Sequence, residues 1–131
     1  MSDFSDLPWF LKEYIHENKW DSFRDVQTEA FKVFRETDDH IIITSATSSG
    51  KTEAALFPII SSLYNDPAEG IGLLYIGPLK ALINDQFERV GPMIEKSGIK
   101  VTGWHGDISA HYDNLRELQL FRVLRSFHRF L

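Results

Sequence analysis

The sequence predicts an α/β fold in which a parallel sheet carries flanking helices. Two observations support this prediction. Short apolar runs alternate with longer segments whose apolar residues have helical spacing, which is the order of parallel strands joined by helices. In addition, the run Ile41-Ile42-Ile43 leads into a loop of small residues that ends in Gly50-Lys51-Thr52 and opens a helix. Strand, loop and helix in this order predict a site for phosphate groups.

The chain is expected to begin with helices. Residues 7–19 predict a short helix after Pro8, and residues 26–35 predict a second helix because their apolar residues recur at helical spacing. Thr37-Asp38-Asp39 ends this pattern. The three β-branched residues 41–43 then predict a strand that is buried on both faces.

The later elements continue the alternation. Further strands are predicted at 72–76 and 99–104, and further helices at 51–64, 79–90 and 115–131. Pro58 should kink the first of these helices or lie near its end. Gly91-Pro92 should interrupt the second, with one more helical turn to Lys96. The loops after the strands should meet at one edge of the sheet, where open α/β sheets bind ligands.

The clearest chemistry lies in the loop itself, Ser45-Ala46-Thr47-Ser48-Ser49-Gly50-Lys51-Thr52. Backbone N–H groups of such a loop point at phosphates, a lysine reaches the β- and γ-phosphates, and a threonine hydroxyl binds Mg²⁺. The segment therefore predicts binding of ATP with Mg²⁺ through Lys51 and Thr52. Ser45 and Ser48 stand where the general motif often has glycine. The alternative is a chance Gly-Lys-Thr at the start of a helix.

The same loop, continued by Glu53-Ala54-Ala55, resembles motif I of the superfamily 2 DEAD/DEAH-box helicases. Its Ser-Ser-Gly-Lys-Thr-Glu form is similar to the large helicase-related and Ski-like branches. The resemblance implies a partial RecA-like P-loop domain in which this loop binds the phosphates of ATP and Mg²⁺.

An upstream segment, Phe23-Arg24-Asp25-Val26-Gln27-Thr28-Glu29-Ala30, resembles the Q-motif region of these helicases. The resemblance implies that Gln27 forms hydrogen bonds with adenine and that an aromatic residue, Trp9 or Phe10, packs near the base. Taken alone, Gln27 would instead be read as a solvated helix residue.

A downstream segment, Gly77-Pro78-Leu79-Lys80-Ala81-Leu82 followed by Gln86, resembles motif Ia. The resemblance implies that Pro78, Leu79 and Lys80 contact the sugar-phosphate backbone of RNA or DNA, and the start of a helix suits that contact. The alternative is a plain turn with a solvated Lys80.

The polar loop His105-Gly106-Asp107, with Thr102-Gly103-Trp104 before it, is similar to a Gly-Asp element of the family or is an ordinary loop. A metal site at His105, Asp107 and His111 is poorly supported, because no fourth ligand has a defined spacing.

The motif-by-motif resemblance covers residues 10–107 and then ends. The family continues with an Asp-Glu-x-His/Asp box, a Ser-Ala-Thr motif downstream of that box and a second RecA-like domain, and none of these follows residue 107 in this sequence. The Ser-Ala-Thr at residues 45–47 belongs to the loop itself. In the family, that box holds Mg²⁺ and positions the attacking water, and the second domain supplies arginine fingers. We therefore expect nucleotide binding without efficient hydrolysis or unwinding, no catalytic residue in this chain, and a second helicase half or another protein as a partner.

Residues 112–131 differ in character from the rest of the chain. They hold four of the 14 basic and two of the 19 acidic residues of a chain whose net charge is −5. The sequence thus predicts a helical segment at 1–36, a partial ATP-binding domain at 37–111 and a basic helix at 112–131. This helix is interpreted as a contact for a partner or nucleic acid, as a cover for the sheet, or as sequence out of frame.

Composition limits the remaining classes of function. Without cysteine the chain has no disulfide and no thiolate-bound zinc. No apolar run approaches the roughly 20 residues that a membrane span needs, and the acidic start is unlike a secretory signal, so a cytoplasmic protein is expected. The competing hypotheses are a non-catalytic interaction protein or helicase remnant, and another P-loop enzyme such as a small kinase.

Overall fold

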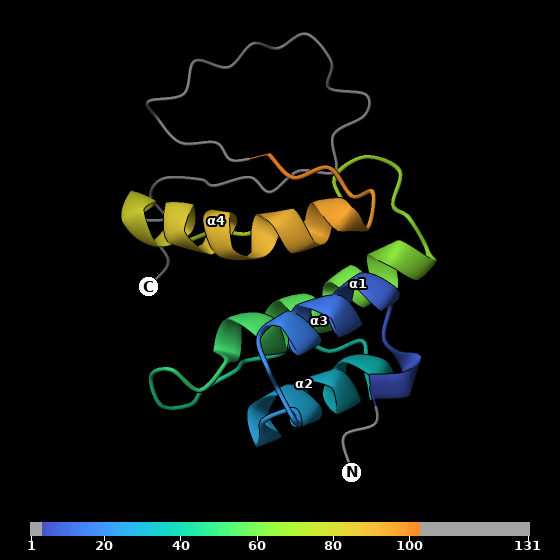
Figure 1. Cartoon of the computed structure of the whole chain (residues 1–131), viewed down its shortest axis with the longest axis vertical. Coiled ribbons are helices and arrows are strands. Elements are labelled where there is room, and N and C mark those ends of the chain that lie inside the picture. Colours follow the sequence, from blue (N-terminus) through green and yellow to red (C-terminus); the bar gives the residue numbers. More distant parts are fainter. Residues whose placement is uncertain (1–3, 103–131) are drawn as a thin grey trace, which may run out of the picture. The chain divides into compact units, whose positions relative to one another are not determined.

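The computed structural model describes residues 4–102. The chain divides into two compact units, Met1–Asp66 and Pro67–Leu131. In the described part, the first unit contains the 3-10 helix η1 (Phe4–Asp6) and the helices α1 (Trp9–Glu17), α2 (Asp25–Glu36) and α3 (Lys51–Asn65), and the second contains α4 (Lys80–Lys96) (Figure 1). The predicted division of the chain at residues 36 and 111 stays a prediction.

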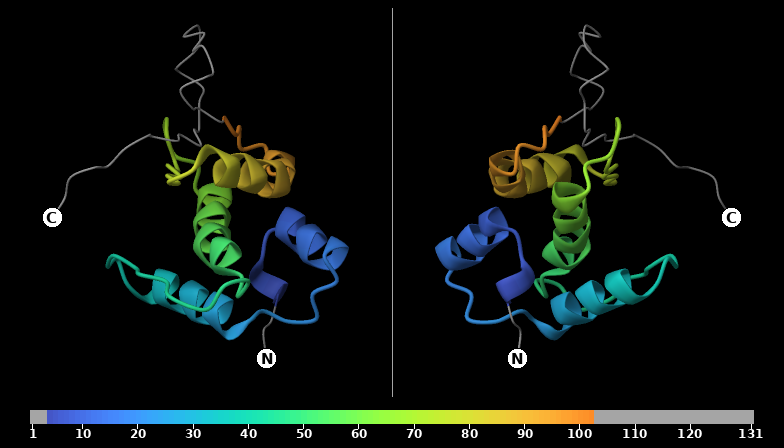
Figure 2. Two further views of the ribbon diagram at one scale, coloured as in Figure 1. Left: turned by 90° about the vertical axis from the view of Figure 1, so that its left-hand side faces the viewer. Right: turned by 90° about the vertical axis from the view of Figure 1, so that its right-hand side faces the viewer.

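The core of the first unit lies where α1 and α2 pack on α3 (Figure 2). All three helices contribute side chains that are almost completely enclosed, namely Phe10, Leu11, Gln27, Leu56, Phe57 and Ile60. Burying one large apolar side chain stabilises a fold by about 1.5–3 kcal/mol. Packing on α3, more than helix propensity, therefore holds these short helices in place.

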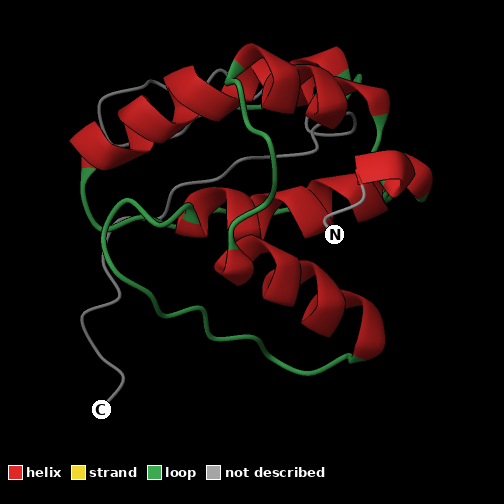
Figure 3. Ribbon diagram, turned by 60° about the horizontal axis from the view of Figure 1, so that its bottom comes forward, coloured by secondary structure: helices red, strands yellow, loops and turns green. Residues whose placement is uncertain are grey.

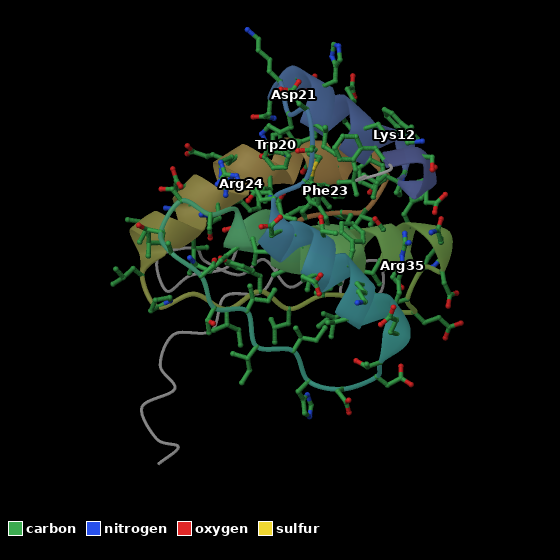
Figure 4. The ribbon with its side chains drawn as sticks, turned by 90° about the horizontal axis from the view of Figure 1, so that it is seen from below. Lys12, Trp20, Asp21, Phe23, Arg24 and Arg35 are labelled. Atoms are coloured by element: carbon green, nitrogen blue, oxygen red, sulfur yellow. The ribbon has the colours of Figure 1, made fainter. Side chains whose placement is uncertain are left out.

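Aromatic rings join the three helices. The ring centroid of Phe57 in α3 lies 5.7 Å from that of Tyr14, 6.1 Å from that of Trp20 and 6.3 Å from that of Phe23. Phe23 also stacks on Phe31 of α2, with 5.4 Å between centroids. Trp20 and Phe23 belong to the link between α1 and α2, so these contacts hold the link, and with it the start of α2, against α3 (Figure 4).

The helices of the first unit confirm the prediction from the sequence. One short helix follows Pro8, a second matches residues 26–35, and a third begins at Lys51. The backbone N–H and the hydroxyl of Thr37 both donate to the carbonyl of Val33, which closes the end of α2. Pro58 lies inside α3 rather than near its end, and it is buried. The helix continues through it because the packing of the buried neighbours offsets the backbone hydrogen bond that proline cannot form.

In the second unit, α4 continues from Lys80 to Lys96 without a break. The predicted interruption at Gly91-Pro92 is therefore wrong. Val90, Met93 and Ile94 are buried around this site while Pro92 is exposed, so the core stabilises the helix through a proline that points outward. The hydroxyl of Ser97 donates to the carbonyl of Ile94 and ends the helix.

The predicted strands at 41–43 and 72–76 are wrong for this structure, and the parallel sheet is not confirmed. Residues 4–102 contain helices and loops but no strand, as Figure 3 shows for the described part of the chain. A strand exists only through a ladder of backbone hydrogen bonds to a neighbouring strand, and residues 4–102 contain no such ladder. Ile42 is 88% exposed, so the face that was expected to be buried is open.

The third predicted strand, 99–104, is not formed at residues 99–102, and its end lies outside the described residues. The helix predicted at 115–131, the loop at 105–107 and the weak metal site at His105, Asp107 and His111 also lie outside them. Within residues 4–102, no helix has both the length and the apolar character that crossing a membrane requires.

Candidate nucleotide-binding site

The loop predicted to bind phosphate lies directly before α3. Gly50 precedes the first helical residue with a φ of 84°, and Ser48 has a φ of 59°. Both values are in the left-handed region, which glycine enters freely and all other residues enter at an energetic cost. Ser48 thus adopts a backbone conformation typical of the glycine that the general motif often has at this place. The carbonyl of Gly50 accepts the first helical hydrogen bond, 2.9 Å from the backbone nitrogen of Ala54.

Lys51 reaches back across the loop. Its ammonium nitrogen lies 2.8 Å from the carbonyl oxygen of Ser45 and 2.6 Å from that of Ala46, and it donates to both. The hydroxyls of Ser45 and Ser49 also share a short hydrogen bond across the loop. The lysine charge is therefore held against the first two residues of the loop, whose last residues open a helix with N–H groups that have no partner within it.

The next residues form the first turn of α3. Thr52 is half-buried and Glu53 is 3% exposed, which puts one carboxyl group into the core at the positive end of the helix dipole. Thr47 is exposed. All eight residues from Ser45 to Thr52 therefore lie in one loop and the helical turn that follows it, as the sequence predicts.

Gln27 lies at the same site but is not a solvated residue, because only 1% of it is exposed. Its amide oxygen accepts a hydrogen bond from the backbone nitrogen of Arg24 at 3.0 Å, and its amide nitrogen donates to the carbonyl of Gly50 at 3.4 Å. The structure therefore brings Gln27 into direct contact with the loop. The contact with adenine that the Q-motif resemblance implies stays a prediction.

Arg24 is a residue of the site that the sequence prediction missed. It precedes α2, is exposed, and donates a hydrogen bond from its guanidinium to the carbonyl of Ser48 (Figure 4). The only signal in the sequence is a cation three residues before Gln27, and a charge next to a helix start is common on protein surfaces.

The predicted aromatic contact of the base is not found at Phe10. This residue is fully buried, and its ring packs on Tyr64 with 5.2 Å between centroids. Tyr64 lies near the far end of α3, about 20 Å from Lys51 at 1.5 Å per residue. Trp9, which contacts Phe10, lies at that far end as well.

The residues predicted to contact nucleic acid lie at the start of α4 in the second unit. Pro78 and Leu79 are exposed, and the helix begins at Lys80. The carbonyl of Leu79 accepts the first helical hydrogen bond, from the backbone nitrogen of Ile83 at 3.2 Å.

Just before this turn, burial raises the pKa of the Tyr75 hydroxyl above 10.0, more than the charge of Arg89 lowers it, so Tyr75 stays protonated at neutral pH. Residues 4–102 contain no group of three side chains that could hold a metal ion by themselves.

Comparison with solved structures shows which known fold this chain resembles. The DUF1998 helicase MrfA, solved in complex with DNA and AMPPNP, matches 94% of this chain with a TM-score of 0.77 and 23% identity. A second structure of MrfA matches 91% of this chain with a TM-score of 0.70. The matched part is 17–19% of those chains. The fold of this chain is therefore similar to that of a segment of MrfA.

The chain belongs to the DEAD/DEAH box helicase family, whose model matches residues 24–126. The matched range extends beyond Asp107, where the motif-by-motif resemblance ends. Curated relatives include activating signal cointegrator 1 complex subunit 3 of Gallus gallus, 35% identical over 74% of this chain, and the U5 small nuclear ribonucleoprotein 200 kDa helicase of Homo sapiens, 30% identical over 70%.

The DExH-box ATP-dependent RNA helicase DExH12 of Arabidopsis thaliana is 37% identical over 50% of this chain. The matches cover only 3–4% of the length of these three relatives.

Proposed function

We propose that this chain is the ATP-binding portion of a DEAD/DEAH-box nucleic-acid helicase and that Ser45 to Thr52 bind the nucleotide phosphates with Mg²⁺. The observation that carries this proposal is the position of Lys51, whose ammonium lies 2.8 and 2.6 Å from the carbonyl oxygens of the first two residues of the loop. A cation beside the N–H groups of a helix start suits a polyphosphate. Thr52, on the same turn, is the proposed Mg²⁺ ligand.

Gln27 is the proposed adenine contact. A glutamine amide offers two N–H donors and two lone pairs, and the observed bonds to Arg24 and Gly50 use one of each. These two bonds leave one donor and one acceptor unused, but Gln27 is only 1% exposed, so the proposed contact requires that its amide become accessible when adenine binds. The structure of MrfA with AMPPNP supports nucleotide binding by this fold.

Pro78, Leu79 and Lys80 are the proposed contacts to a nucleic-acid backbone. The support is the exposed turn ahead of α4, because the first N–H groups of a helix have no partner within it and favour phosphate oxygens. MrfA was solved with DNA, and DExH12 is named an RNA helicase, so both nucleic acids stay open as ligands.

The proposed activity is nucleotide binding without efficient hydrolysis or unwinding by this chain alone. A non-catalytic interaction protein or a helicase remnant is the second candidate, favoured by the same missing carboxylate box. A small kinase is disfavoured by the family to which the chain belongs. A second helicase half or another protein as partner, and a cytoplasmic location, stay predictions.

Calorimetric titration with Mg-ATP and Mg-ADP tests the proposal. Lys51→Ala should weaken both affinities about tenfold or more, because it removes a charged hydrogen-bond donor from the phosphates. Lys32→Ala is the matched control, since it removes the same charge from an exposed position on α2. Equal affinities in the unaltered chain and Lys51→Ala would contradict the proposal.

A further inference from the structure

Two side chains at the start of α2 bind the phosphate loop by its carbonyl groups. The guanidinium of Arg24 donates to the carbonyl of Ser48, and the amide of Gln27 donates to the carbonyl of Gly50. The bond from the backbone nitrogen of Arg24 to the amide oxygen of Gln27, 3.0 Å long, ties the two residues together. The carbonyl groups of Ser48 and Gly50 thus both accept hydrogen bonds from side chains at the start of α2.

The contact with Arg24 determines where one N–H group of the loop points. The C=O of one residue and the N–H of the next belong to one planar peptide unit, and in the trans form they point in opposite directions. No peptide bond is cis in the described part of the chain. The carbonyl of Gly50 also accepts the first hydrogen bond of α3, so its direction is set mainly by that helix. The carbonyl of Ser48 is held by Arg24 at the start of α2, so the N–H group of Ser49 points away from that contact. Phosphate-binding loops use such N–H groups as their donors.

The two residues whose carbonyls are bound differ in the energetic cost of their left-handed backbone conformation. Gly50 adopts its φ of 84° without a side-chain penalty. Ser48 has a φ of 59° and does pay that penalty. Arg24 bonds to the carbonyl of Ser48 itself, so the charged hydrogen bond acts where the loop is least stable by its own chemistry.

We propose that Arg24 is a positioning residue for the phosphates: by holding the Ser48 carbonyl, it keeps the left-handed turn of the loop and aims the Ser49 N–H at the nucleotide. This inference rests on the proposed function of the loop and adds a residue to it. Arg24 acts through the backbone of Ser48, and a direct contact between its guanidinium and the nucleotide is the rival account.

Arg24→Ala in the full chain should weaken Mg-ATP and Mg-GTP binding by the same factor, about tenfold, the value of one charged hydrogen bond. Arg24→Lys should recover part of the loss because lysine keeps one charged donor. Arg35→Ala is the matched control: it removes an arginine from the other end of α2 (Figure 4) and should bind as the unaltered chain does. Unchanged affinity in Arg24→Ala would overturn the proposal.

Ser48→Gly separates positioning from direct contact. Glycine adopts the left-handed turn without the penalty, so Ser48→Gly should restore most of the ATP affinity that Arg24→Ala loses. An arginine that contacts the nucleotide itself would be missed equally in both backgrounds. A double variant as weak as Arg24→Ala alone, or a change in ATP-to-GTP preference in Arg24→Ala, would therefore overturn the proposal.

Amide hydrogen exchange tests the same contact without nucleotide. Arg24→Ala should speed exchange in peptides that span residues 46–52 and leave α4 unchanged, whereas equal exchange in this loop would overturn the inference. Failure of the unaltered chain to bind nucleotide would refute the proposed function. Nucleotide binding that Arg24→Ala leaves intact would refute only the role of Arg24.

Discussion

Gly50 is constrained twice, by its backbone and by its neighbour. Its φ of 84° lies in the left-handed region. A Cβ atom added here would lie 2.4 Å from the amide nitrogen of Gln27, closer than a real Cβ contact allows. Gly98 has nearly the same φ, 85°, and a Cβ atom there would meet nothing within 4 Å. Alanine substitutions at the two glycines therefore distinguish the energetic cost of the backbone conformation from the cost of the steric contact with Gln27.

Gly98→Ala should cost only the backbone penalty, about 1–2 kcal/mol of the free energy of unfolding. Gly50→Ala should cost more and should also weaken Mg-ATP binding, because Gln27 must move away from the loop. Urea unfolding followed by circular dichroism and calorimetric titration measure the two effects. In the Gln27→Ala background the excess cost of Gly50→Ala should disappear; strictly additive costs would contradict the role given to this contact.

At the scale of residues, the sequence indicated the loop but not the side chains that contact it. The spacing of Gly50, Lys51 and Thr52 indicates the loop, and the structure puts Gln27 against it. The bond from Arg24 to Ser48 could not be predicted, because it depends on the left-handed turn at a serine and on how α2 packs against α3. The place of Ser48, where the motif often has glycine, is a signal for the turn, but the packing of α2 on α3 that brings Arg24 to it has no signature in the sequence pattern.

Phe57 joins the elements of the first unit, since its ring lies beside those of Tyr14, Trp20 and Phe23. It is fully buried in the middle of α3, the helix that begins with Lys51. The loop and α3 are continuous, so the packing that fixes α3 also fixes the helical turn of the proposed phosphate site.

Phe57→Ala should lower the free energy of unfolding by about 3–5 kcal/mol, the cost of removing a large buried aromatic side chain. Trp9→Ala is the control, because Trp9 is 53% exposed and its removal should cost far less. Circular dichroism during urea unfolding measures both. Equal, small effects would show that the rings around Phe57 do not hold this unit together.

At the scale of elements, periodicity predicted the helices well and the strands poorly. The apolar spacing of α2 and α3 reflects packing within the chain, so it survives in the structure. Gly91-Pro92 misled the prediction because the buried face of α4 outweighs local helix breaking. Residues 41–43 have the composition of a buried strand, but a strand needs a partner, and apolar composition alone does not supply one.

At the scale of the molecule, the chain is small beside its relatives: the matches cover 3–4% of the length of the three curated helicases compared. The Asp-Glu box that would hold Mg²⁺ and orient water is absent from the sequence. Arginine fingers from a second domain contribute about 10³–10⁵ in rate to phosphoryl transfer. We therefore expect residues 1–131 alone to bind nucleotide without efficient hydrolysis.

The purified chain should release phosphate from Mg-ATP no faster than Lys51→Ala does, with or without RNA or DNA. A coupled phosphate-release assay measures this, and an intact helicase of the same family serves as the positive control. Rapid turnover by this chain that Lys51→Ala abolishes would refute the argument from the missing carboxylates.

The central claim is that the loop before α3 binds nucleotide through its phosphates. Titration calorimetry of Mg-ATP into the unaltered chain and into Lys51→Ala tests it most directly. The account predicts one nucleotide per chain and a loss of affinity of about tenfold or more in the variant. Identical binding isotherms, or no binding by an unaltered chain whose circular dichroism shows it to be folded, would contradict it.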